Sequence, residues 1–195
     1  MGLKITFVDP NEIICEELRK CFLSNDSVNV VTGIFSDVKK YDCIVSPGNS
    51  FGLMDGGIDY YIVDYFGKIV MENVQKRILS DFRGEQPCGT SIIVETGNIN
   101  HPWIAHTPTM RIPSKIFDGD VYRSMWSMLL AVWNFNKVES RINEILCSGL
   151  GTGYGQVKPE IAAHEMYAAW NNFHNPPNNL TWDHALSIEE SVKKR

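Results

Sequence analysis

Two glycine-rich stretches carry the residues best suited to hold a ligand. The first, residues 46–59, reads Ser-Pro-Gly-Asn-Ser-Phe-Gly-Leu-Met-Asp-Gly-Gly-Ile-Asp. The second, residues 148–155, reads Ser-Gly-Leu-Gly-Thr-Gly-Tyr-Gly. Glycine lets the backbone approach a ligand closely, and the unpaired N–H groups at the start of a helix favour an anion. Two such loops in one small chain predict a ligand with more than one phosphate.

Each loop stands between a predicted strand and a predicted helix. The apolar run 41–45 precedes the first loop, and the apolar spacing of residues 60–82 predicts one long helix after it. Residues 145–147 form a strand before the second loop, and a helix is predicted over 159–173. Open α/β sheets bind ligands beyond the carboxyl ends of their strands. We therefore expect both loops at the ligand-binding edge of one sheet.

The rest of the chain also alternates strand and helix. The first strand ends near Asp9, which is expected to cap a helix that begins at Pro10. This pattern predicts a three-layer α/β/α sandwich with a mixed, mostly parallel sheet. A length of 195 residues suits one domain, expected over 1–173, with a loose or docked tail at 174–195. The remaining strands are predicted at 28–32, 42–46, 91–96 and 103–107, and a further helix at 118–135.

Composition narrows the function classes. The net charge of −5 gives no broad basic field for duplex nucleic acid, so backbone dipoles would have to hold an anion. Five scattered cysteines fit free thiols in a reducing compartment better than disulfides or a metal site, and neither a metal nor a cofactor is expected. The chain shows no signal-peptide core and no apolar run of membrane-spanning length. We expect a cytoplasmic or nuclear protein.

Two common nucleotide-binding classes do not fit the loops. Neither loop carries the Gly-Lys-Ser/Thr sequence that places an amine on the terminal phosphates of a P-loop NTPase. The first strand–helix unit has Val8-Asp9-Pro10 where a dinucleotide-binding enzyme has Gly-x-Gly-x-x-Gly. Hydride transfer and P-loop phosphate hydrolysis are therefore disfavoured.

At both loops the chain resembles the macrodomain family of ADP-ribose-binding modules. The family's first loop is roughly Asn-Ala-Ala-Asn, five residues, then Gly-Gly-Gly-Val and often Asp. Residues 46–49 and 55–59 correspond to it here as Ser-Pro-Gly-Asn and Asp-Gly-Gly-Ile-Asp, with Pro47-Gly48 in place of the usual Ala-Ala. Asn49 and Asp59 are separated as the corresponding pair is in mono-ADP-ribosyl hydrolase members. The family's second loop, Gly-x-Gly-Thr-Gly, is matched by residues 149–153. The resemblance extends over roughly residues 28–170 and implies the macrodomain fold.

The resemblance also implies roles for individual residues. Asn49 would bond the distal ribose and Asp59 would orient the attacking water, so these two are the candidate catalytic residues. Tyr154 would close over the distal ribose, and the helix after Pro159 would add part of its dipole at the pyrophosphate. The other implied ligand-binding residues are Gly33, Ile34, Phe35, Gly48, Gly56, Gly57, Ile58, Ser148, Gly149, Leu150, Gly151, Thr152 and Gly153.

One departure concerns the base. Many family members carry Gly-Asp-Ile-Thr, whose Asp accepts from the adenine amino group, whereas residues 33–36 here read Gly-Ile-Phe-Ser. Either adenine is read by the backbone and by Phe35, or the base is not the determinant; in a shifted register Asp37 would take the place of the missing carboxylate. A missing buried hydrogen-bond partner costs roughly 1–3 kcal/mol.

The leading function is binding of ADP-ribose, or an ADP-ribosylated substrate, followed by hydrolysis. The bond would link ADP-ribose to a protein side chain, an ester or a 1″-phosphate, as in ADP-ribosylglycohydrolases or ADP-ribose 1″-phosphatases. A non-catalytic ADP-ribose-binding module and an interaction protein with a dead pocket are the alternatives. At residue level, Asp59 is alternatively a helix N-cap or first-turn acid, Asn49 a turn residue. His106 fits a core histidine better than a base.

Overall fold

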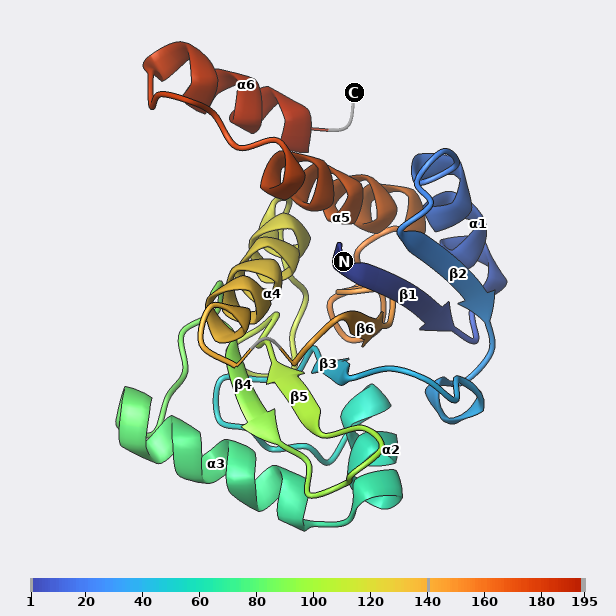
Figure 1. The fold of residues 1–195 in the computed structure, drawn as a ribbon, viewed down its shortest axis with the longest axis vertical. Helices are drawn as coiled ribbons and strands as arrows, with labels where there is room; N and C mark the ends of the chain where they lie inside the picture. Colours follow the sequence, from blue (N-terminus) through green and yellow to red (C-terminus); the bar gives the residue numbers. More distant parts are fainter. Residues whose placement is uncertain (1, 140, 194–195) are drawn as a thin grey trace.

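One mixed sheet forms the centre of the protein (Figure 1). The computed structural model describes residues 2–139 and 141–193, and in these ranges six strands are ordered β2-β1-β6-β3-β5-β4. β4 runs antiparallel to β5, and the other neighbouring pairs are parallel. The strands are β1 (Lys4–Asp9), β2 (Val28–Thr32), β3 (Cys43–Ser46), β4 (Ile92–Glu95), β5 (Trp103–His106) and β6 (Glu144–Cys147).

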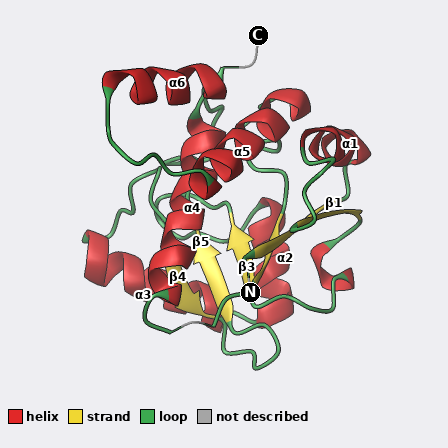
Figure 2. Cartoon of the chain, turned by 45° about the horizontal axis from the view of Figure 1, so that its top comes forward, coloured by secondary structure: helices red, strands yellow, loops and turns green. Residues whose placement is uncertain are grey.

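Helices cover both faces of this sheet. Figures 1 and 2 show α1, α4 and α5 on one face and α2 and α3 on the other. A short 3₁₀ helix, η1 (Phe35–Asp37), follows β2. The predicted three-layer α/β/α sandwich is confirmed. The α-helices are α1 (Glu12–Cys21), α2 (Gly57–Phe66), α3 (Ile69–Phe82), α4 (Asp120–Asn136), α5 (Pro159–His174) and α6 (Trp182–Val192).

The strands divide their side chains between two cores. Successive strand residues point to opposite faces, so Cys43 and Val45 of β3 pack under α1, α4 and α5, whereas Ile44 packs under α2 and α3. In β6, Leu146 likewise joins the second core. Strands buried on both faces must be apolar at every position. Burial on both faces therefore explains the continuous apolar runs before the two glycine loops.

The single long helix expected over 60–82 is wrong, because the chain forms two helices there. Gly67 ends α2 with φ +85°, and its N–H donates to the backbone oxygen of Val63 at 2.8 Å. Glycine enters this left-handed region at little cost and commonly terminates helices. Asp9 also does not cap α1: Asn11 does, accepting from Ile13 N at 3.0 Å.

The tail contains a helix that the sequence pattern did not predict. Thr181 caps α6 by accepting from the backbone N–H of His184 at 3.1 Å. Asn172 of α5 donates to the hydroxyl of Ser191 at 3.0 Å, so α6 contacts α5. Figure 1 shows α6 beyond α5, away from α2 and α3. Among the described residues, no helix combines the length and apolar character needed to cross a membrane.

Candidate functional site

The carboxyl ends of the parallel strands bring the two glycine loops together. β3 pairs directly with β6, with Ile44 opposite Leu146, and β1 lies on the other side of β6. The first loop follows β3 and the second follows β6, so both begin side by side at one edge of the sheet. Between them lies a cleft of about 1020 Å³. The expectation that both loops lie at one edge of the sheet is confirmed.

The loops also meet at their far ends. A Cβ added at Gly56, the N-cap of α2, would lie 3.6 Å from Cε2 of Tyr154. The Tyr154 ring therefore extends from the second loop onto the first, while 61% of the residue stays exposed. Gly57, with φ +57°, begins α2 immediately beside this contact. The first N–H groups of a helix have no partner within it, so this end of the cleft offers hydrogen-bond donors to an anion.

Close backbone packing within the second loop determines its shape. Gly151 adopts φ +73°, and a Cβ on Gly155 would lie 2.5 Å from the backbone oxygen of Gly151. Thr152 donates its hydroxyl to the backbone oxygen of Gly149 at 3.0 Å. Side chains would not fit at Gly151 and Gly155, so peptide groups form the surface of this loop. Leu150 is the exception among the expected ligand-binding residues of this loop, because its side chain is buried in the core and does not line the cleft.

Asn49 organises the first loop. Its side-chain amide donates to the backbone oxygen of Leu53 at 2.7 Å, and its Oδ1 accepts from the N–H groups of Phe51 at 3.0 Å and Leu53 at 3.3 Å. The alternative role as a turn residue is therefore present. The side-chain NH₂ has two hydrogens, and the bond to Leu53 uses one of them. Asn49 also lines the cleft, and its hydrogen bond to a ribose stays a prediction.

Asp59 is a buried carboxyl group in the wall of the cleft. It lies in the first turn of α2, is 4% exposed, and accepts from the hydroxyl of Ser46 at 2.8 Å. Burial raises the pKa of Asp59 to about 7, against the effect of the Ser46 hydrogen bond, and the charge of Asp55 acts in the same direction as burial. Of the alternative roles, the N-cap does not apply, because Gly56 occupies it, whereas the first-turn acid does, because Asp59 lies in the first turn of α2.

His106 lies at the end of β5, next to β3. It is fully buried, and its Nδ1 lies 2.9 Å from Oε1 of Gln86. Burial lowers the pKa of His106 to about 4, so the ring is neutral at physiological pH. The predicted core histidine is confirmed.

The opposite end of the cleft lies at β1 and β2. Gly33, Ile34 and Phe35 line it as expected, but Asp37 does not. A carboxylate is nevertheless present, because Asp9 at the end of β1 lines the same end. The sequence analysis missed Asp9 as a site residue, although its position at a strand's carboxyl end was the available signal.

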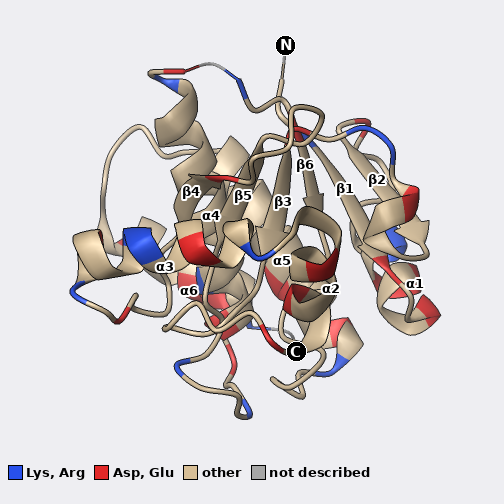
Figure 3. Cartoon of the chain, turned by 90° about the horizontal axis from the view of Figure 1, so that it is seen from below, with Lys and Arg blue, Asp and Glu red and all other residues tan. Residues whose placement is uncertain are grey.

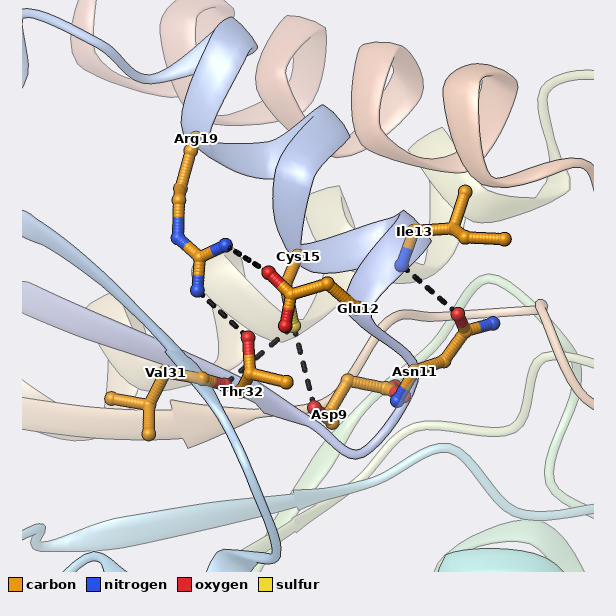
Figure 4. Close-up of polar contacts among 8 residues, drawn as sticks. All are labelled: Asp9, Asn11, Glu12, Ile13, Cys15, Arg19, Val31 and Thr32. Carbon is orange, nitrogen blue, oxygen red and sulfur yellow. Dashed lines mark hydrogen bonds and ion pairs between the residues drawn. The ribbon is translucent and has the colours of Figure 1, made fainter.

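Asp9 is held by a polar network around the start of α1, drawn in Figure 4. Its Oδ1 accepts from the backbone N–H of Asn11 at 2.9 Å, and its Oδ2 accepts from that of Gly149 at 3.1 Å. The thiol of Cys15 donates to the backbone oxygen of Asp9 at 3.3 Å. The carboxylate thus has a defined orientation between α1 and the second loop.

Aromatic residues of α2 complete this wall. Tyr61 and Tyr65 line the cleft and are 62% and 45% exposed, so they form its rim and not the core. The ring of Tyr65 packs edge-on against Phe35 at 5.6 Å between centroids. Met110 also lines the cleft, whereas the neighbouring Arg111 is paired with Glu85 at the surface. The N-terminus of α5, expected to support the pyrophosphate, contributes no lining residue.

The charge in the cleft is entirely acidic. Among the described residues that line it there is no lysine, arginine or histidine. Figure 3 shows the acidic residues of α2 in red, with no blue on that helix. An anionic ligand must therefore be held by peptide N–H groups. The acidic lining residues are Asp9, Asp55, Asp59 and Asp64.

Comparison with known proteins identifies the family. The model of the Macro-like domain family matches residues 12–177. The chain belongs to this family. A relative of this Macro-like domain, an uncharacterized protein of Aquifex aeolicus (strain VF5), is 29% identical over 140 residues, which cover 71% of this chain and 78% of the relative.

Solved macrodomains share the fold of this Macro-like domain. The macrodomain of Mycobacterium tuberculosis DarG has a TM-score of 0.62 at 17% identity, covering 88% of this chain and 92% of its own. The Oceanobacillus iheyensis macrodomain with ADP has a TM-score of 0.58 at 18% identity, with coverages of 80% and 86%. The Trypanosoma brucei macrodomain in complex with ADP-ribose has a TM-score of 0.57 at 14% identity, with coverages of 97% and 69%. The resemblance in the two loops is thereby confirmed at the level of family and fold.

Proposed function

We propose that this Macro-like domain binds ADP-ribose, or a close derivative, and hydrolyses an ADP-ribosyl bond. The observation that carries this proposal is that both glycine loops line one cleft, with the Tyr154 ring 3.6 Å from where a Cβ on Gly56 would lie. The loops present peptide N–H groups and no cationic side chain, which suits a diphosphate held by local dipoles. The similar macrodomains solved with ADP and with ADP-ribose support the same ligand class.

The two ends of the cleft suit the two ends of this ligand. The apolar and aromatic wall of Ile34, Phe35 and Tyr65 suits a base, and Asp9 offers a carboxylate for its amino group. Asn49 and Tyr154 also line the cleft, and the distal ribose would bind to them. The diphosphate would then lie between the start of α2 and the second loop.

Asp59 is the residue that we assign to the chemistry. In the proposed step a water oxygen bonds to C1″ of the distal ribose as the bond from C1″ to the leaving group breaks. The water's proton passes to the carboxylate of Asp59, and the leaving atom takes up a proton from solvent. A pKa of about 7 leaves a substantial fraction of Asp59 ionised at neutral pH, and its basicity is higher than that of an ordinary carboxylate. The candidate substrates carry ADP-ribose on a protein side chain, in an ester or in a 1″-phosphate.

Capture without turnover is the alternative, and two observations favour it. The polar atoms of Asn49 already hold the first loop. Asp59 is only 4% exposed, which restricts its access to a water. Under this alternative the chain is an ADP-ribose-binding module.

Calorimetry and turnover of the same variants separate these functions. Wild-type protein should bind ADP-ribose more tightly than ADP, because only ADP-ribose reaches Asn49 and Tyr154. Asp59→Ala should keep binding within a few-fold and lose hydrolysis of ADP-ribosylated protein, ester and 1″-phosphate. Wild-type binding without turnover of any of these would establish capture. Absence of any heat with ADP-ribose would reject both functions.

A further inference from the structure

We propose that Ser46 positions the carboxyl group of Asp59, holding one carboxyl oxygen so that the other takes up the proton of the attacking water. The catalytic use of this arrangement rests on the proposed function. The hydrogen bond belongs to the protein alone, so its effect on Asp59 can be tested without substrate.

Ser46 reaches Asp59 because of its place in the sheet. It is the last residue of β3, and its backbone oxygen accepts from the N–H of Thr107 at 2.8 Å. Side chains alternate along a strand, so Ser46 points to the same face as Ile44, which packs under α2 and α3. Asp59 lies in the first turn of α2, and its Oδ1 accepts from the Ser46 hydroxyl at 2.8 Å. A central strand therefore fixes the hydroxyl that holds the carboxyl group.

The two carboxyl oxygens of Asp59 have different surroundings. Ser46 is fully buried and does not line the cleft, so Oδ1 is directed to a group inside the protein. Oδ2 lies 2.6 Å from where a Cβ on Gly48 would be, and both Gly48 and Asp59 line the cleft. Within the described part of the chain, Ser46 is the hydrogen-bond partner of Asp59, which leaves Oδ2 to accept from a water.

The Ser46 hydrogen bond also favours the ionised form of Asp59, which is the form that can act as a base. A hydroxyl donates more strongly to a carboxylate than to a neutral carboxylic acid. Burial raises the pKa of Asp59 to about 7, the Ser46 hydrogen bond opposes this rise, and the charge of Asp55 adds to it. His106 of β5 also lies beside Gly48, but burial lowers its pKa to about 4 and its ring is neutral. Of these groups, Ser46 is the one that favours the carboxylate.

NMR titration of the protein without ligand tests the hydrogen bond. The ¹³C signal of the Asp59 carboxyl carbon is identified by its loss in Asp59→Asn. Ser46→Ala should raise the titration midpoint by about one pH unit, because a hydrogen bond to a charged group is lost. Ser46→Thr retains a hydroxyl and should stay near wild type. Ser46→Cys has a similar size but only a weak donor, so it should approach Ser46→Ala.

Ser50→Ala is the matched control for this titration. Ser50 is a buried serine of the same loop, and its hydroxyl lies 3.7 Å from the thiol sulfur of Cys88 and not on Asp59. Its removal should leave the Asp59 midpoint unchanged.

Kinetics of the same variants test the catalytic use. The substrate is whichever of the ADP-ribosylated protein, ester and 1″-phosphate the wild type hydrolyses. In Ser46→Ala the acid limb of the kcat profile should move to higher pH by the same amount as the Asp59 midpoint, and kcat at pH 7 should fall several-fold. Affinity for ADP-ribose should stay within about twofold, because Ser46 does not line the cleft. Ser46→Thr should restore the profile.

Three results would overturn the proposal. They are a wild-type midpoint in folded Ser46→Ala, a midpoint in Ser46→Thr that rises as far as in Ser46→Ala, and an unmoved kcat profile in a Ser46→Ala protein whose midpoint has moved. Should Ser46→Ala not fold, equal midpoints in Ser46→Thr and Ser46→Cys would contradict the hydrogen bond. A wild type that hydrolyses none of the substrates would refute the proposed function and the catalytic use of Ser46, while the titrations would still decide the hydrogen bond.

Discussion

Oδ2 of Asp9 accepts a hydrogen bond of 3.1 Å from the backbone N–H of Gly149. Asp9 ends β1 and Gly149 begins the loop after β6, so this bond joins two adjacent strand ends that are distant in sequence. It links the end of the cleft assigned to the base with the loop assigned to the diphosphate. A substitution at Asp9 should therefore affect both the base end of the cleft and the second glycine loop.

Replacing Asp9 should weaken ligand binding through this link. Asp9→Ala removes the acceptor for Gly149 and the carboxylate facing the base, and should lower ADP-ribose affinity by about tenfold or more, as for loss of a charge-assisted hydrogen bond. Asp9→Asn retains an acceptor oxygen and should fall between wild type and Asp9→Ala. Calorimetry with ADP-ribose measures the effect, and equal affinities for wild type and Asp9→Ala would exclude the link.

Gly48 should not tolerate a side chain. The added methyl of Gly48→Ala would lie 2.6 Å from Oδ2 of Asp59 and 2.8 Å from Nε2 of His106, where the surrounding strands leave little room to move. We expect a loss of about 1–3 kcal/mol in the free energy of unfolding, typical of overpacking. Chemical denaturation provides the measurement. Gly153→Ala is the control, since no atom lies within 4 Å of its Cβ position, and it should change stability little.

The opposite pKa shifts of Asp59 and His106 should make their joint contribution to stability nearly independent of pH between about 4 and 6.5. The pKa of Asp59 is raised from 3.8 to about 7, so its stabilising contribution is complete below 3.8 and is lost as pH rises through 7. The pKa of His106 is lowered from 6.5 to about 4, so its contribution is complete above 6.5 and is lost as pH falls through 4. Over the shared window the two slopes are opposite and largely cancel.

Asp59→Asn should expose the histidine contribution alone. In this variant the free energy of unfolding should rise with pH between about 4 and 6.5, with a slope approaching about 1 kcal/mol per pH unit relative to wild type. Denaturation series at fixed ionic strength measure it, with Asp37→Asn as the control. A variant whose pH dependence parallels that of the wild type would show that the two groups do not compensate each other.

Tyr154 should matter for binding and not for folding. Its ring lies near Gly56, but the residue is 61% exposed, so Tyr154→Ala removes little buried surface and should leave stability within about 0.5 kcal/mol. ADP-ribose affinity should fall several-fold in this variant, and affinity for ADP should fall less, because ADP lacks the distal ribose. Tyr154→Phe retains the ring and should stay near wild type. An equal loss of affinity for both ligands would show that the distal ribose does not contact Tyr154.

Much of the architecture could be predicted from local patterns. Apolar runs buried on both faces, such as Ile44 and its neighbours in β3, mark the central strands because side chains alternate across the sheet. The two glycine loops follow β3 and β6, and parallel strands place such ends at one edge. The break at Gly67 was missed, since apolar spacing continues across it and only the backbone conformation separates α2 from α3.

The sequence by itself determined the layered fold, the two glycine loops and the candidate pair Asn49 and Asp59, because strand alternation, glycine content and spacing are local properties. Only the tertiary structure decided which groups meet across strands. It joined Asp9 to Gly149 and brought the side chains of Asp59 and His106 next to Gly48. These contacts depend on strand order and on the register of β1, β3, β5 and β6, which hydrogen bonds between distant segments establish. The spacing of residues along the chain does not specify that strand order.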